Sequence, residues 1–164
     1  MEDRKLKEIE HSKKRREILG GFERLSDTHA ANQVEDLDEL ITDKKKFDYY
    51  FSNMKFYAIT ISSEKYKKKW LRKYCQKGTK VLDFACGSGE NGIYAASCGA
   101  EVLGIDISPE GIENAKKNAK RLNVSKYCKF ETMDGENMQF SDNSFDFAVE
   151  YGALHHVKLE KALT

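Results

Sequence analysis

Proline, paired cysteines and long apolar runs are what this sequence lacks. Its 164 residues include one proline and four cysteines, and no two cysteines form a Cys-x-x-Cys pair. This usage argues against a zinc site and a disulfide framework, and it favours reduced thiols in the cytoplasm. No window approaches the ~18 consecutive apolar residues of a membrane-spanning helix, and the charged start lacks the apolar core of a secretory signal. Neither a metal site nor a membrane role is therefore expected.

The charge is divided unevenly between the two halves of the chain. Residues 1–80 carry 20 Lys and Arg side chains against 14 Asp and Glu, whereas residues 81–164 carry 8 against 13. The basic clusters at 13–16, 44–46 and 65–74 lie near aromatic residues, as in nucleic-acid-binding surfaces. They also fit the solvent face of amphipathic helices, which is the interpretation we favour.

The N-terminal part of the sequence predicts helices rather than a sheet. Residues 3–19 form a polar helical pattern that is closed by Gly20 and Gly21. This helix would belong to a charged helical extension over residues 1–45. Residues 46–77 are expected to form a second segment, helical and rich in aromatic side chains.

A packing helix is predicted near the end of that second segment. Ser62 has the character of an N-cap, and the helix expected over residues 63–75 places Tyr66, Trp70 and Tyr74 at four-residue spacing. Its lysines fall on the other faces. The aromatic stripe is therefore expected to face the core.

From residue 78 the pattern changes to strands that alternate with helices. Short apolar runs are separated by helical patterns of about 10–15 residues, and Ser108 before Pro109 marks a helix start. Such alternation predicts parallel βαβ units. Residues 78–164 are therefore expected to form the N-terminal half of a Rossmann-like α/β domain with four parallel strands. The expected strands are 80–85, 101–107, 128–133 and 145–150, and the expected helices are 90–99 and 109–122.

The glycine loop raises the question of which adenosine cofactor it holds. Gly87, Gly89 and Gly92 form the Gly-x-Gly-x-x-Gly pattern of dinucleotide-binding loops. Asp83 argues against a dinucleotide, because a carboxylate about 4–6 Å from a pyrophosphate charge costs about 3–4 kcal/mol at an effective dielectric near 20. S-adenosylmethionine has no phosphate and carries a sulfonium and an ammonium. The residues therefore favour S-adenosylmethionine over a nicotinamide cofactor.

Three further acids lie at the ends of predicted strands. Asp106 and Glu150 lie within the last two residues of the second and fourth apolar runs, and Asp134 directly follows the third. Ligands of open parallel sheets bind at the carboxyl ends of the strands, so all four acids are expected along one rim. Asp106 suits a ribose diol, which both cofactors possess, and Asp134 suits an adenine amino group.

These motifs, in this order, resemble those of class I S-adenosylmethionine-dependent methyltransferases. The likeness covers residues 78–157 and includes the run "FDFAVEYGALHHV" at 145–157. The resemblance implies that Asp83, Ala85, Cys86, Gly87, Ser88 and Gly89 hold the methionine moiety, that Asp106 binds the ribose and Ile107 packs on the adenine, that Asp134, Gly135 and Glu136 border the adenine edge, and that Glu150 and Tyr151 close the wall beside the sulfonium.

The resemblance also implies methyl transfer to a small-molecule acceptor, because the ending "LHHV" resembles that of small-molecule methyltransferases. His155 and His156 are the candidate general bases near the rim, with a structural role as the alternative for both. The aromatic run 47–57 is expected over the cofactor cleft. Tyr57 or Tyr66 would face the sulfonium there or pack in the core.

By the same resemblance the sequence is expected to be C-terminally truncated. A complete domain of this family has seven strands, and this sequence stops in the helix after the fourth. The fourth strand would then be an exposed edge for self-association or for a complementing chain. Two other readings stay open. One is a ribose or tRNA methyltransferase that uses the basic N-terminal helices, although "EYGA" at 150–153 lacks the prolines of the base-amino class. The other is a non-catalytic remnant that binds the cofactor or a partner.

Overall fold

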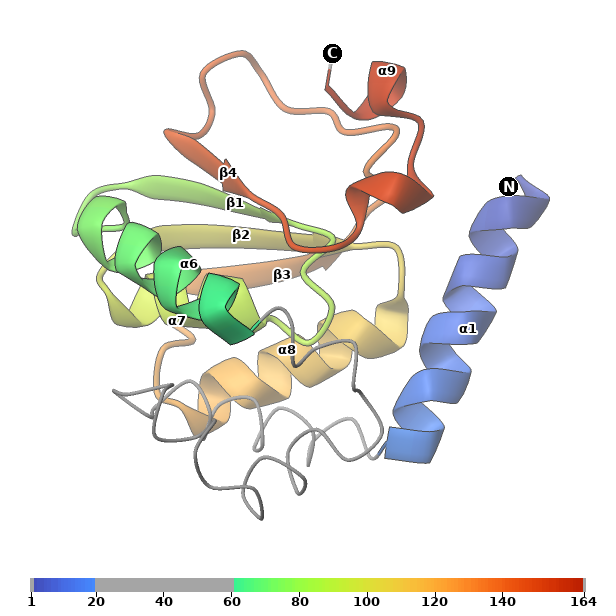
Figure 1. Ribbon diagram of the computed structural model, residues 1–164, viewed down its shortest axis with the longest axis horizontal. Helices are drawn as coiled ribbons and strands as arrows, with labels where there is room; N and C mark the ends of the chain where they lie inside the picture. Colours follow the sequence, from blue (N-terminus) through green and yellow to red (C-terminus); the bar gives the residue numbers. More distant parts are fainter. Residues whose placement is uncertain (1, 20–60, 164) are drawn as a thin grey trace.

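A computed structural model describes residues 2–19 and 61–163. Its centre is a parallel four-stranded sheet in the order β3-β2-β1-β4, which confirms the predicted Rossmann-like arrangement (Figure 1). The strands are β1 (Lys80–Phe84), β2 (Glu101–Asp106), β3 (Cys128–Thr132) and β4 (Phe147–Val149), and the helices are α1 (Asp3–Leu19), α6 (Ile61–Tyr74), α7 (Glu90–Ser97), α8 (Pro109–Arg121), η1 (Leu154–His156) and α9 (Leu159–Ala162).

Side chains of β1 alternate between the two faces of the sheet, and both sets are buried. Val81 packs into a core shared with Ile93 of α7 and Ile112 of α8. Leu82 and Phe84 point to the opposite face, into a smaller core that α9 closes with a buried alanine. Both faces of a parallel strand must be covered because crossover helices flank it. The helices α6, α7 and α8 lie on one side of the sheet in Figure 1.

Helix α8 begins as the sequence predicts. The hydroxyl of Ser108 accepts a hydrogen bond from the backbone amide of Gly111 at 3.1 Å, and Pro109 is the first helical residue. Ile112, Ala115 and Ala119 are buried along its inner face. The N-cap fixes the direction in which the chain leaves the end of β2.

Helix α6 differs from the prediction in its start and in its buried face. It begins at Ile61, so Ser62 lies inside the helix and is not its N-cap. Tyr66 is 72% exposed, whereas Leu71 and Cys75 are almost fully buried. The four-residue spacing predicted that the face with the aromatic residues is buried. The face that carries Leu71 is the buried one instead.

Two of the three aromatic residues of α6 still pack against the protein, at the edge of the sheet. The rings of Trp70 and Tyr74 lie 5.2 Å and 5.8 Å from the ring of Phe147 in β4. Strand β4 is one of the two outer strands of the described sheet, and the sequence predicted it as an edge. It has three residues, and its Phe147 is partly covered by α6. The predicted long apolar edge is thus shorter than the sequence suggested.

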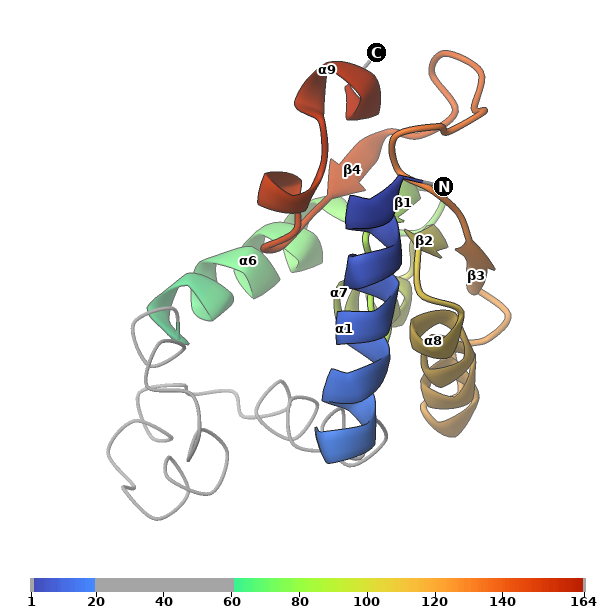
Figure 2. The ribbon, with the colours of Figure 1, turned by 90° about the vertical axis from the view of Figure 1, so that its right-hand side faces the viewer.

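Helix α1 crosses the carboxyl ends of the strands. Figure 2 looks onto those ends, and α1 stands in front of the sheet between η1 and α8. The predicted helix over residues 3–19 is confirmed. The run 47–57 with Tyr57, and the boundary expected at residue 45, lie outside the described residues. In the described part of the chain, no helix is long and apolar enough to cross a membrane.

Candidate functional site

The loop after β1 is a left-handed turn. Ala85, Gly87 and Gly89 have φ angles of 52°, 56° and 86°, a region that glycine adopts freely and other residues seldom enter. The amide of Gly89 donates to the carbonyl of Cys86 at 2.8 Å, and the amide of Cys86 donates to the carbonyl of Ile105 at 2.8 Å. The loop is therefore tied both to itself and to β2.

Asp106 joins the glycine loop to the end of β2. Its Oδ2 accepts the amide of Gly87 at 2.8 Å, and its Oδ1 accepts the amide of Ser108 at 2.8 Å. Its carbonyl accepts the amide of Met133 at 2.9 Å, which links the end of β3 to the same point. A carboxylate oxygen can accept more than one hydrogen bond. Asp106 thus retains capacity to accept from a diol while it fixes the loop.

Asp83 is buried completely beneath the loop. Its Oδ2 accepts the amide of Gly92 at 2.7 Å, and its Oδ1 has no hydrogen-bond partner among the described residues. Burial raises the pKa of Asp83 to about 7, although the Gly92 amide and the ammonium of Lys67 both favour the charged form. The predicted repulsion of a pyrophosphate assumed a fully charged, solvent-facing carboxylate. The structure weakens that argument, because this group lies inside the protein and is easily protonated.

Two glycines of the fingerprint are required by packing within the protein. A Cβ on Gly92 would lie 2.8 Å from Oδ2 of Asp83, and a Cβ on Gly89 would lie 3.0 Å from Ala115 and from the ring of Phe130. Glycines in loops of this kind let the backbone approach a ligand closely. The observed contacts show that they also allow α7 and α8 to approach the sheet closely.

The loop after β3 packs onto the end of β1. A Cβ on Gly135 would lie 2.5 Å from the ring of Phe84, so only glycine fits there without a shift of the ring. The Oδ1 of Asp134 accepts the amide of Glu136 at 3.0 Å. The loops that follow β1, β2 and β3 therefore meet at one end of the sheet, as the predicted rim requires.

Glu136 binds the N-terminal helix. Its carboxylate is almost fully buried, bonds to the guanidinium of Arg4, and lies 2.9 Å from the ammonium of Lys5. It also accepts the amide of Lys158 at 2.8 Å. The Lys158 amide, with Lys5 and Arg4, lowers the pKa of Glu136 to about 2. Glu136 is therefore a charged anchor for α1.

The segment after β4 is also fixed by its acid. The carboxylate of Glu150 accepts the amide of Ala153 and, at 3.1 Å, that of Leu154. It thereby braces the turn that leads into η1. The exposed ring of Tyr151 has the ammonium of Lys67 over it, 4.1 Å from the ring centroid. The ammonium of Lys67 thus contacts Tyr151, the side chain that the resemblance assigns to the wall beside the sulfonium.

The two candidate general bases are exposed neighbours with different surroundings. The rings of His155 and His156 are 3.8 Å apart. Nδ1 of His156 lies 3.1 Å from the carboxylate of Glu8, and its carbonyl accepts from Arg4. His156 thus serves the contact with α1, a structural role that the sequence left open.

Four residues near the rim escaped the sequence analysis. Arg4 and Lys5 reach it from α1, and Lys67 reaches it from α6. Asn118 of α8 is fully buried and donates to the carbonyl of Ser88 at 3.2 Å, which supports the glycine loop. The only sequence signal for the first two was the basic excess of the N-terminal half facing the acidic excess of the other.

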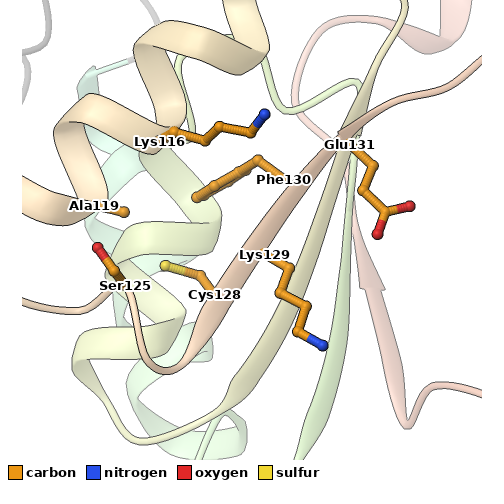
Figure 3. Close-up of a pocket in the computed structure, with 7 residues that line it drawn as sticks. All are labelled: Lys116, Ala119, Ser125, Cys128, Lys129, Phe130 and Glu131. Atoms are coloured by element: carbon orange, nitrogen blue, oxygen red, sulfur yellow. The ribbon is translucent and has the colours of Figure 1, made fainter.

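A hollow of about 390 Å³ lies away from this rim, between α8 and the outer strand β3 (Figure 3). Cys128 and Phe130 face α8 in it, whereas Lys129 and Glu131 point to the other side of the strand. Burial raises the pKa of the Cys128 thiol to about 11, so this thiol is not a nucleophile near neutral pH. The described residues contain no cluster of metal-ligating side chains either.

Known proteins resemble part of this chain. Ribosomal protein L11 methyltransferase of Burkholderia multivorans is 48% identical over 54 residues, which are 32% of this chain and 18% of that protein. The crystal structure of the YcgJ protein from Bacillus subtilis matches with a TM-score of 0.54 and 27% identity over 60% of this chain and 43% of that one.

A second solved structure shares the fold at lower identity. It is geranyl diphosphate C-methyltransferase of Streptomyces coelicolor A3(2) in complex with Mg²⁺, geranyl diphosphate and S-adenosyl-L-homocysteine. The TM-score is 0.53 at 16% identity, covering 60% of this chain and 38% of that one. The profile of the family described as "Methyltransferase domain" matches residues 81–164. The chain belongs to this methyltransferase domain family.

Proposed function

We propose that this chain is an S-adenosylmethionine-dependent methyltransferase, or the cofactor-binding half of one, which transfers a methyl group to a small-molecule acceptor. The observation that carries the proposal is the pair of backbone hydrogen bonds accepted by the carboxylate of Asp106. Asp106 fixes the left-handed glycine loop through Gly87 and the start of α8 through Ser108, and it stands at the carboxyl end of β2, where sheets of this type bind nucleosides.

The residues present fit the proposed cofactor. Asp106 keeps lone pairs for ribose hydroxyls, and the loop 85–89 lies beside it. The unpartnered Oδ1 of Asp83 supplies negative potential beneath the loop, which favours a cationic ligand once the carboxyl ionises. When bound, S-adenosylmethionine supplies an electrophilic methyl group on its sulfonium.

The chain would contribute binding and orientation rather than bond-breaking chemistry. In this account Asp106 orients the ribose, while Asp134 receives the adenine amino group. Glu150 holds the turn that carries Tyr151, so the aromatic wall stays in place. Positioning of this kind lowers the barrier of a displacement by removing the freedom of the reacting partners. A neutral acceptor would also need a base, for which His155 is the better candidate because His156 contacts α1.

Two observations bear on the acceptor. The "LHHV" ending supports a small molecule, and this is the acceptor we propose. A protein acceptor is the second candidate, supported by the 48% identity over 54 residues with a ribosomal protein L11 methyltransferase. In the first turns of α1, Arg4, Lys5 and Lys7 pair with acids of the same chain, so these three cations give a nucleic-acid acceptor no support.

Calorimetric titration tests the cofactor site. We expect S-adenosylhomocysteine and S-adenosylmethionine to bind wild-type protein, NADH not to bind, and Asp106→Ala to lose at least about 2 kcal/mol, since hydrogen bonds to charged groups contribute about 1.5–3 kcal/mol each. Ser141→Ala, in the exposed turn before β4, serves as the control and should bind like wild type. Absence of binding by a chain that is folded by circular dichroism would contradict the proposal.

The same preparation separates catalysis from mere binding. Methyl transfer from labelled cofactor into a panel of phenols, amines and carboxylic acids is expected if the chain is catalytic by itself, and peptide pools test the protein acceptor. Cofactor binding without transfer to any acceptor would support the non-catalytic alternative.

A further inference from the structure

Helix α1 lies across the part of the rim where the adenine of the proposed cofactor would bind. Arg4 bonds to Glu136 and to the carbonyl of His156, which join α1 to the loops after β3 and β4 at once. The ammonium of Lys158 lies 3.0 Å from the carboxylate of Glu2. Contacts between residues more than 120 positions apart thus place the first turns of α1 over the carboxyl ends of the strands (Figure 2).

Lys5 pairs with Asp134, the acid that the resemblance assigns to the adenine amino group. Its ammonium lies 2.5 Å from Oδ2 of Asp134 and 2.9 Å from Oε2 of Glu136, and its side chain is only 12% exposed. The other oxygen of Asp134 accepts the amide of Glu136. An adenine amino group is a neutral donor, and a charged donor forms the stronger hydrogen bond to a carboxylate. Adenine and Lys5 would therefore compete for the carboxylate of Asp134.

We propose that α1 is a strap that competes with the cofactor, so that Lys5 must leave Asp134 before the adenine edge binds. This inference rests on the proposed cofactor site. The strap makes the binding-competent state a fraction of the free protein, which lowers the apparent affinity by that fraction.

The contacts of the strap allow it to open. The side chains of Arg4, Glu2 and Lys158 are 37%, 45% and 43% exposed, so water and salt compete for their ion pairs. Leu6 is 51% exposed and adds little apolar burial. A helix that is held mainly by charged side chains at its first two turns can be released without unfolding the sheet.

Affinity measurements on charge-neutral variants test the strap. We expect Lys5→Gln to bind S-adenosylhomocysteine about 5–20-fold more tightly than wild type, because the competing state is removed, and Arg4→Gln to change in the same direction. Lys7→Gln is the matched control, since Lys7 pairs with Asp3 of the same helix at 3.0 Å and is 75% exposed. Its affinity should equal that of wild type.

Salt supplies a second, independent readout. S-adenosylhomocysteine has no net charge, so raising NaCl from about 0.05 M to about 0.5 M should tighten its binding to wild type by weakening the strap. The effect should be smaller for Lys5→Gln, which lacks the ion pairs of Lys5 but keeps those of Arg4 and Lys158. Weaker or equal binding by Lys5→Gln would contradict the strap and leave the cofactor site standing. Absence of binding by wild type and by every variant would contradict both proposals.

Discussion

Asp83 and Glu136 are both buried carboxyl groups at the same end of the sheet, yet their environments have opposite effects on their charge. Asp83 has one backbone donor, and burial raises its pKa to about 7. Glu136 accepts from the Lys158 amide and pairs with Lys5 and Arg4, and its pKa is lowered to about 2. The difference shows that burial raises the pKa of an acid with a single donor, whereas several backbone and cationic donors lower the pKa of another acid nearby.

This contrast divides the rim into two functional parts. The loop after β1 is built on backbone hydrogen bonds and a carboxyl group that is partly protonated near neutral pH. The loop after β3 is built on ion pairs with a helix more than 120 residues away in sequence. The first part should respond to pH and hardly to salt, whereas the second should respond to salt.

The largest effect is expected from the ionisation of Asp83. Between its ordinary pKa of 3.8 and about 7 the folded protein holds a proton that the unfolded chain has released. The free energy of unfolding therefore falls as the pH rises through this window, by on the order of 4 kcal/mol over three pH units.

Urea unfolding of wild type and of Asp83→Asn, at intervals from pH 4 to pH 8, measures this dependence. The variant should show a flatter profile, because it lacks the buried ionisable group. Parallel profiles for the two proteins would show that Asp83 titrates normally and that its environment has been misread.

Substitution of the glycine that bonds Asp83 should have the next largest effect. Gly92→Ala would bring a Cβ within 2.8 Å of the Asp83 carboxylate and 3.0 Å of Val102, and overpacking of this kind costs about 1–3 kcal/mol. Gly152→Ala, at a glycine with φ of 83° and nothing within 4 Å of its Cβ, reports backbone strain alone. Gly92→Ala should have the lower midpoint of thermal unfolding. A midpoint equal to or above that of Gly152→Ala would contradict the close approach of α7.

A smaller effect is expected from substitution of Glu136. Glu136→Gln removes the charge that holds Arg4 and Lys5, so trypsin should cut within residues 3–14 about tenfold faster, as loss of one charged hydrogen bond implies. Glu113→Gln breaks an exposed pair with Lys116 on α8 at 3.0 Å and is the control. Equal cleavage of all three proteins would mean that Glu136 does not dock α1.

Local signals explain why most of the sheet was predictable. The alternation of apolar runs with amphipathic segments set the four strands, and Ser108 with Pro109 set the start of α8. Asp106 was placed correctly at a strand end because it is the last residue of β2. Each of these inferences depends on neighbours within a few residues.

The remaining features depend on contacts that no local pattern encodes. Asp83 points under α7 because the amide of Gly92 meets it there, and Glu136 points to α1 because Arg4 and Lys5 reach it across 132 and 131 positions. Lys68 of α6 is buried although it is a lysine in a charged helix. The direction of a side chain at a strand end is a tertiary property, so the sequence indicated the acids without indicating what they face.

Hydrogen exchange with and without S-adenosylhomocysteine tests the central claim most directly. Saturating ligand should slow exchange at 85–89, 106–108 and 134–136, and it should speed exchange in residues 3–12 as the strap is released. Slower exchange over residues 3–12 would contradict the competition between α1 and the cofactor. Unchanged exchange at the three strand ends would contradict the cofactor site itself.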